Sequence, residues 1–275
     1  SFELGKGQVI PGWEVGVGLL KKGSKATFYI SSPLAYGERS PGPEIPKNAI
    51  LVVAGKVKKD EVKALCEKWF EPIAAKEVMI RSLPQEDDLK ENTFLEIKGD
   101  VPSNCLYLAF PMPGRYEYGY HTVDLLSDLL GRGDSSHLFH ELVQKNRIFD
   151  SINAYVTGSL DPGILVIQGT VCEGIDFDTA KTKVFDSIFD FIESGINERS
   201  LQKVKNQTES SLAFMEVEIL NKAMNLAMAA NSGDPNLVNQ EADKINQVSI
   251  EEMKNWADKL FKKGCHHVLW YQKNQ

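Results

Sequence analysis

Short runs of β-branched, aromatic and alternating apolar residues recur along the chain and predict β-strands. Residues 105–112 and 163–171 show the pattern clearly, and residues 161–163, Asp-Pro-Gly, predict a turn before the second of these strands. The uncharged run at 49–53 predicts a buried strand. The predicted strands are residues 26–30, 49–53, 94–99, 105–112, 152–158, 163–171 and 266–271.

Apolar residues at every third or fourth position predict helices in much of the remaining sequence. Residues 121–131 carry valine and leucine at this spacing, and Gly131 is expected to end that helix. Ser249 and Glu252 form a capping-box pattern, in which the hydroxyl and the carboxylate bind free backbone N–H groups. The predicted helices are residues 58–70, 121–131, 135–145, 176–194, 197–230, 234–246 and 249–262.

The composition and the density of predicted strands and helices change along the chain, and these changes predict its domain organisation. Residues 1–46 contain eight of the 21 glycines and five of the 12 prolines, among short β-type runs. Residues 47–75 hold one predicted strand and one helix, and residues 76–92 are polar and irregular, as in a linker. Residues 93–275 carry enough strands and helices for a complete α+β domain.

Composition narrows the classes of function. The 275 residues carry a net charge of −7, which disfavours a general nucleic-acid binder. No stretch reaches the roughly 20 apolar residues of a membrane span. The four cysteines are spaced far apart and contain no C-x-x-C pattern. The chain begins at Ser1 without a visible signal peptide, and this start is consistent with a cut, so the compartment stays open.

Residues 1–46, through the string FELGKGQVIPGWEVGVGLLKKGSKATFYISSPLAYGERSPGPEIP, resemble the second half of an FKBP-type peptidyl-prolyl isomerase. The resemblance implies a partial FKBP-like β segment with an apolar proline pocket, which would favour a twisted X-Pro amide over a planar one. The pocket positions that it carries onto this chain are Phe2, Val9, Ile10, Trp13, Tyr36 and Ile45. The sequence departs from the family at Val53, where a pocket Phe belongs, and the first half of the fold is not among these residues.

From residue 47 onward the chain resembles the insulinase/pitrilysin-type metallopeptidases. The strings that carry this resemblance are LAFPMPG, LLSDLLGRGDSSHLFHELVQKNRIFDS, GSLDPGILVIQGTV and SIEEMKNWADKLF. Residues 47–75 resemble the closing strand and helix of the first homologous domain, and residues 93–275 resemble the second, inactive domain. The resemblance implies an α+β fold with an antiparallel sheet and helices packed on it. Two or four such domains close into a peptide-holding chamber.

Catalysis in that family needs a helical H-x-x-E-H motif that binds zinc, and this sequence has none. His137, His140 and Glu141 have the wrong spacing and order, so we expect polar groups of an ordinary helix there. The second domain of the family often carries an Arg and a Tyr that bind the substrate carbonyl. The aligned positions here are Val143 and Asp150, which cannot stabilise an oxyanion. We therefore expect no catalytic residue and no metal in this chain, with zinc only in a partner domain.

These observations predict a non-catalytic peptidase-type domain that helps to form a peptide-binding chamber. Its expected partners are an unfolded or extended peptide and a zinc-bearing peptidase homologue. Two alternatives stay open. The chain could act as a prolyl isomerase if the missing half of the fold is supplied. It could also be a recombinant or artefactual fusion without isomerase activity, because both families carry a string like that from Pro46 to Val53.

Overall fold

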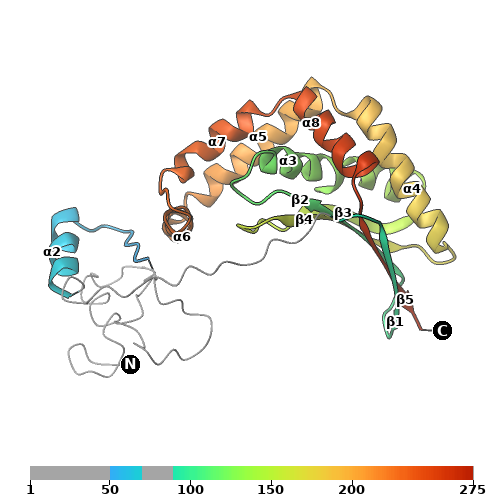
Figure 1. Ribbon diagram of the computed structural model, residues 1–275, viewed down its shortest axis with the longest axis horizontal. Helices are drawn as coiled ribbons and strands as arrows, with labels where there is room; N and C mark the ends of the chain where they lie inside the picture. The colour runs from blue at the N-terminus through green and yellow to red at the C-terminus, as the bar shows by residue number, and fades with distance from the viewer. Residues whose placement is uncertain (1–49, 70–88, 275) are drawn as a thin grey trace. The chain divides into compact units, whose positions relative to one another are not determined.

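The computed structural model describes residues 50–69 and 89–274 (Figure 1). They divide into two units: residues 50–69 with 210–241, and residues 89–209 with 242–274. The elements are α2 (Lys59–Trp69), β1 (Thr93–Gly99), β2 (Cys105–Met112), α3 (Tyr120–Gly131), η2 (Phe139–Lys145), β3 (Phe149–Val156), β4 (Gly163–Val171), α4 (Phe177–Asp190), η3 (Phe191–Gly195), α5 (Glu198–Met215), α6 (Ile219–Asn231), α7 (Leu237–Gln247), α8 (Ile250–Ala257), η4 (Asp258–Lys263) and β5 (His267–Lys273). No helix of the described segments is long and apolar enough to cross a membrane.

The larger unit is built on a five-stranded sheet with the order β1-β5-β2-β4-β3. Tyr107 of β2 pairs with Gln168 of β4 on one side and with Leu269 of β5 on the other, both antiparallel. β1 runs parallel to β5, and this is the one parallel pair of the sheet in the described segments. The expected α+β fold is therefore confirmed, and the sheet is antiparallel except at its β1–β5 edge.

Helices cover one face of this sheet, and the core lies between the two layers. Alternate residues of β2 are buried, including Leu106, Leu108 and Phe110, because strand side chains point to opposite faces. In Figure 1, α3 and α8 lie above the strands, and the apolar stripe of α3 completes the core. Gly131 ends α3 as predicted, and a Cβ there would collide with the backbone of Ala154, so the glycine also permits close helix–strand packing.

The capping-box prediction at the start of α8 is half right. Glu252 N donates to Ser249 Oγ at 3.1 Å, as the motif requires. The Glu252 carboxylate instead accepts a hydrogen bond from Thr122 Oγ1 at 2.8 Å. The same sequence signal therefore starts one helix and ties it to the first turn of α3.

The prediction of a buried strand at 49–53 is wrong for residues 50–53, which form no strand. Val52 is 8% exposed and packs with Ala223 and Ala227 of α6. A β-strand needs a neighbour for its backbone N–H and C=O groups, and no described strand pairs with this segment. Its apolar side chains are buried against a helix instead.

The prediction of one continuous helix over 197–230 is also wrong. α5 ends at Met215 and α6 begins at Ile219, with Glu218 in an extended backbone conformation between them. The break allows the alanine side of α6 to meet Val52. No glycine or proline marks it in the sequence. The predicted strand at 26–30 and the boundaries at 46 and 75 lie outside the described residues.

Candidate functional site

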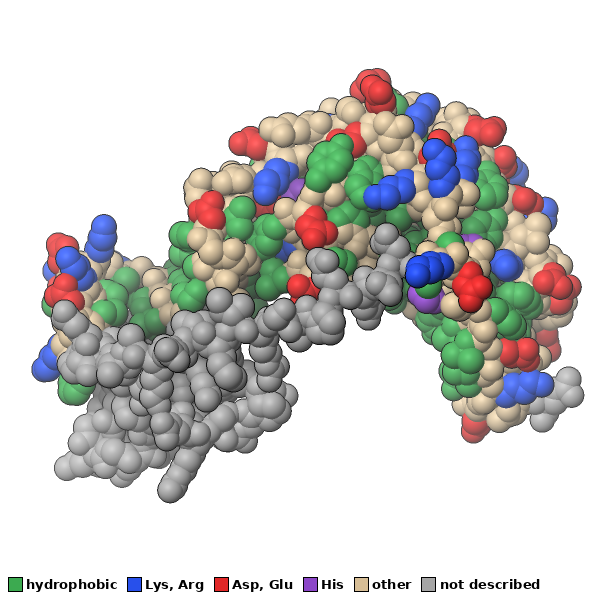
Figure 2. Space-filling view, viewed as in Figure 1, with side chains coloured by type: hydrophobic (Ala, Val, Ile, Leu, Met, Phe, Trp, Pro, Cys, Tyr) green, Lys and Arg blue, Asp and Glu red, His purple; other side chains and the backbone are tan. Residues whose placement is uncertain are grey.

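No helix of the larger unit covers the second face of the sheet in Figure 1, and we call it the open face. Strand pairing aligns its residues in rows across the sheet. The two central rows of the open face are formed by Leu95, Ile97, Cys105, Tyr107, Ser151, Asn153, Gln168, Thr170, Leu269 and Tyr271. Tyr155 lies in the next row, with Val166, Ala109, His267 and Thr93. Figure 2 shows apolar side chains gathered over β1 and β5. Leu95 is 56% exposed and Tyr155 is 44% exposed, so large apolar groups of this face meet solvent.

The central rows of the open face combine apolar side chains with neutral hydrogen-bonding groups. None of these side chains carries a carboxylate, an ammonium or a guanidinium group. Gln168 Nε2 donates to Tyr107 Oη at 3.3 Å, and burial raises the pKa of Tyr107, which keeps the phenol neutral. Phenol and amide groups can bind peptide backbone without regard to side-chain charge. This chemistry suits an extended peptide of varied sequence.

The two positions aligned with the family's substrate-binding pair lie in different elements. Val143 lies in the π-helix η2, and Asp150 is the extra residue of a bulge between Phe149 and Ser151 in β3. Asp150 Oδ1 accepts a hydrogen bond from Cys172 Sγ at 3.3 Å, and burial raises the pKa of that thiol. Neither Val143 nor a carboxylate at 150 can donate a hydrogen bond to a developing oxyanion.

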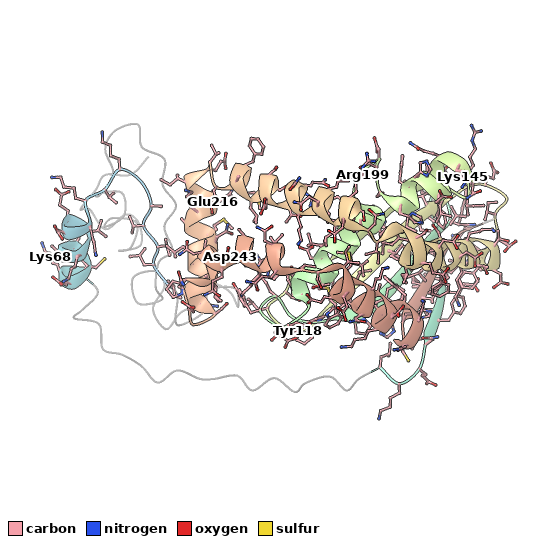
Figure 3. All side chains as sticks on the ribbon, turned by 90° about the horizontal axis from the view of Figure 1, so that it is seen from above. Lys68, Tyr118, Lys145, Arg199, Glu216 and Asp243 are labelled. Atoms are coloured by element: carbon pink, nitrogen blue, oxygen red, sulfur yellow. The ribbon has the colours of Figure 1, made fainter. Side chains whose placement is uncertain are left out.

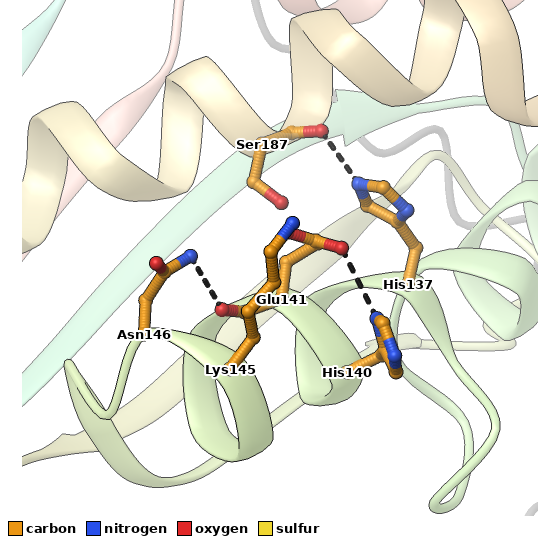
Figure 4. A network of polar contacts seen from close by, with 6 residues as sticks. All are labelled: His137, His140, Glu141, Lys145, Asn146 and Ser187. Atoms are coloured by element: carbon orange, nitrogen blue, oxygen red, sulfur yellow. Dashed lines mark hydrogen bonds and ion pairs between the residues drawn. The ribbon is translucent and has the colours of Figure 1, made fainter.

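The His137 segment forms a polar network that joins η2 to α4 (Figure 4). His137 Nε2 donates to the carbonyl oxygen of Ser187 at 2.9 Å. Glu141 binds His140 Nδ1 through Oε1 at 3.1 Å and Lys145 Nζ through Oε2 at 3.0 Å. Each of these groups therefore already has a partner within the fold.

Electrostatics in this network also fit a structural role. Burial lowers the pKa of His137, so its ring is neutral near pH 7, and the Lys145 ammonium lowers the pKa of Glu141. In the described segments no group of three or more His, Cys, Asp or Glu side chains could hold a metal ion. Residues 139–145 of this segment form a π-helix, and the contacts of its polar groups link it to α4.

The six residues predicted to form a proline pocket lie outside the described residues. They are Phe2, Val9, Ile10, Trp13, Tyr36 and Ile45. The open face, in contrast, was not predicted as a site. Strand alternation indicated which residues of β2 and β4 would point away from the core, but the pairing of β1 with β5 had no local signal.

A sheet with helices on one face and a neutral, half-exposed surface on the other defines an α+β domain. Residues 45–208 match the model of the peptidase M16 inactive domain, which is more than half of the 275 residues. The chain therefore belongs to the peptidase M16 inactive-domain family. The resemblance to the second domain of insulinase/pitrilysin-type peptidases is confirmed.

Solved structures share this fold. A protease from Helicobacter pylori has a TM-score of 0.74 at 20% identity, over 82% of this chain and 56% of that chain. The peptidase M16 inactive domain from Pseudomonas fluorescens has a TM-score of 0.69 at 15% identity, over 83% of this chain and 54% of that chain. The inactive peptidase domain of a putative zinc protease from Bordetella parapertussis has a TM-score of 0.58 at 15% identity, over 65% of this chain and 95% of that chain.

The first residues match a different family. Residues 1–54 match the FKBP-type peptidyl-prolyl cis-trans isomerase model, which confirms the resemblance of residues 1–46 to that family. This match overlaps the M16 match at 45–54. A probable FKBP-type isomerase, FkpA of Neisseria meningitidis, is 62% identical over 45 residues, which is 16% of this chain and 16% of that protein. FK506-binding protein 4 of Rhizopus delemar is 52% identical over 52 residues, which is 19% of this chain and 14% of that protein. The chain spans less than a fifth of either relative.

Proposed function

We propose that this chain is a non-catalytic peptidase M16 domain that lines a peptide-holding chamber. The observation that carries the proposal is the open face. A sheet surface with large apolar groups such as Leu95 and Tyr155 exposed to solvent is characteristic of a surface that binds a partner molecule. Its neutral tyrosine and amide groups suit the backbone of an extended peptide.

A partner would cut the peptide bond, because the sequence carries no H-x-x-E-H motif and the described residues hold no cluster that could bind a metal ion. Val143 and Asp150 stand at the positions of the family's carbonyl-binding pair. His137 and Glu141 are committed to Ser187, His140 and Lys145. A zinc ion held by the partner would activate the attacking water, while this chain would hold the peptide across its sheet.

Two binding measurements test this proposal. The full chain should co-elute in size-exclusion chromatography with a zinc-bearing M16 homologue from the same source. It should also bind a labelled unfolded peptide, detected by fluorescence anisotropy. The test variant is Tyr155→Ser, which should lower peptide affinity without changing the circular dichroism spectrum. If the chain binds neither the homologue nor the peptide, the proposal is wrong.

A second candidate function is prolyl isomerisation, and the match of residues 1–54 to the FKBP-type model favours it. The family's fold needs a first half that these residues do not include. We expect the 275-residue chain alone to leave the isomerisation time of a prolyl peptide at its uncatalysed value of tens to hundreds of seconds. A faster reaction that is lost in Trp13→Ala would make the isomerase hypothesis the better one.

A further inference from the structure

β1 forms an edge of the sheet, and its outer side has no partner strand in the segments that the structure describes. Thr93 N donates to His266 O at 3.1 Å, and Gly99 O accepts from Asn274 N at 2.9 Å, so both residues face β5. Backbone groups alternate along a strand. The residues that turn their N–H and C=O groups outward are therefore Phe94, Glu96 and Lys98. Such a row is a template for an added strand.

A cavity of about 420 Å³ lies beside this edge, on the helical side of the sheet. Three aromatic rings contribute to its lining. Phe94 and Phe177 have ring centroids 4.8 Å apart, and Phe177 and Trp270 have centroids 5.5 Å apart. The carboxylates of Glu96 and Asp176 also line the cavity. Aromatic faces next to a carboxylate form an environment that favours a cationic side chain.

The two carboxylates differ in what they already bind. Asp176 Oδ1 accepts from Thr179 N at 2.8 Å and caps α4, and this hydrogen bond lowers the pKa of Asp176. Glu96 is exposed and makes no hydrogen bond or ion pair with any described residue. Lys181 Nζ lies 5.8 Å from the ring centroid of Phe177, so one cation already uses this aromatic group. Of the two carboxylates, Glu96 is the one left to bind a ligand.

We propose that the β1 edge binds an extended peptide by strand addition, and that the cavity takes a Lys or Arg side chain of that peptide. The inference rests on the proposed function and names the peptide class. In an added antiparallel strand, the residue opposite Glu96 places its side chain on the same face of the sheet. Its charge then meets the Glu96 carboxylate and the rings of Phe94 and Phe177. Lys98 lies on that face as well and disfavours a second basic residue opposite it.

Fluorescence anisotropy with the full chain tests the cavity. The probes are a short labelled peptide with one central Arg in a β-forming sequence and the same peptide with Gln at that position. We expect the Arg peptide to bind about tenfold more tightly, as one ion pair with cation–π contact provides. Glu96→Gln should remove this preference, and Glu96→Lys should reverse it toward a peptide with central Glu. Asp243→Asn is the matched control, since Asp243 is an exposed carboxylate of α7 (Figure 3).

Strand addition has a separate test. Peptides N-methylated on alternate amides should divide into two groups, because only the amides that face β1 donate to it. Methylation of one set should abolish binding, and methylation of the other set should leave it unchanged. If wild type binds Arg and Gln peptides equally, the cavity assignment is overturned while the proposed function stands. If no peptide binds at all, both are overturned.

Discussion

The two faces of the five-stranded sheet carry different kinds of residue. On the helical face, alternate β2 residues such as Leu108 and Phe110 have no solvent exposure. On the open face of the same sheet, Tyr107, Gln168 and Thr170 are only half-buried. The helical face accounts for the stability of the fold, because its apolar area is removed from water. The open face is not needed for that purpose, which is why it is the candidate site.

The largest difference between the faces should be the loss of unfolding free energy when a large side chain on each face is truncated to alanine. Phe110 packs edge-on against Phe261 with ring centroids 4.8 Å apart. We expect Phe110→Ala to lower the free energy of unfolding by about 3–5 kcal/mol through lost burial and a cavity. Tyr107→Ala on the open face should cost clearly less. Urea unfolding of both variants measures this, and equal losses would contradict the division between the faces.

The next effect concerns a buried cation on the helical side. Lys205 is 8% exposed, and its Nζ donates to the carbonyls of Asn246 at 2.8 Å and Val248 at 2.6 Å. These carbonyls lie at the end of α7, where a cation also favours the helix dipole. We expect Lys205→Ala to lower the free energy of unfolding by about 2–3 kcal/mol. Lys203→Ala is the control, because Lys203 is exposed. If Lys203→Ala lowered the free energy of unfolding by a similar amount, the burial of Lys205 would not explain its effect.

A smaller effect depends on pH. His266 is 8% exposed between the rings of Phe110 and Phe185, and both ring nitrogens lack a hydrogen-bond partner in the described segments. Burial lowers its pKa below the ordinary 6.5, and the neighbouring cation Lys181 lowers it further. Below pH 6.5 the unfolded chain therefore binds more protons than the folded chain.

Stability should consequently fall as the pH drops from 6.5 toward the lowered pKa of His266, and should be fully present above 6.5. His266→Leu should flatten this dependence, because the variant lacks the group whose pKa differs between the folded and the unfolded chain. Melting temperatures of wild type and variant between about pH 5 and 8 measure this difference, because histidines change their charge in that range. An unchanged profile in the variant would assign the dependence to His137 or to the carboxylates.

The smallest effect on stability should come from the open face, together with a large effect on binding. Leu95→Ser removes a side chain that is 56% exposed, so we expect a change in unfolding free energy within about 0.5 kcal/mol. The same variant should weaken peptide binding several-fold, because its apolar contact is lost. A stable variant with unchanged peptide affinity would show that the open face is not the binding surface.

Local patterns predicted the centre of the domain well. β2 was predicted with its bounds, because Leu106, Leu108 and Phe110 alternate with less buried residues. α3 was predicted to within one residue, since its valine and leucine positions repeat with the helical period. These elements obey rules that act within a few residues. Asp161 and Pro162 lie in the bend that precedes β4, and Gly163 is the first residue of that strand.

Long-range pairing was not predictable in the same way. Thr93 and His267 are neighbours across the parallel edge, although they lie 174 positions apart in the sequence. Val52 is buried against α6, a helix that begins only at Ile219. The Phe94–Phe177–Trp270 cavity unites three segments that no local pattern connects. Short sequence strings therefore identified the family but not the surface that we assign to peptide binding.

Hydrogen exchange of the full chain with and without an unfolded peptide is the decisive measurement for a peptide-binding sheet. We expect saturating peptide to slow amide exchange in β1 (Thr93–Gly99), where the outward N–H groups gain acceptors. Exchange in η2, which adjoins His137 and carries Glu141 and Lys145, should stay unchanged. Peptide-dependent protection confined to η2 and α4, or no protection anywhere, would contradict the assignment of this sheet as a peptide-binding surface.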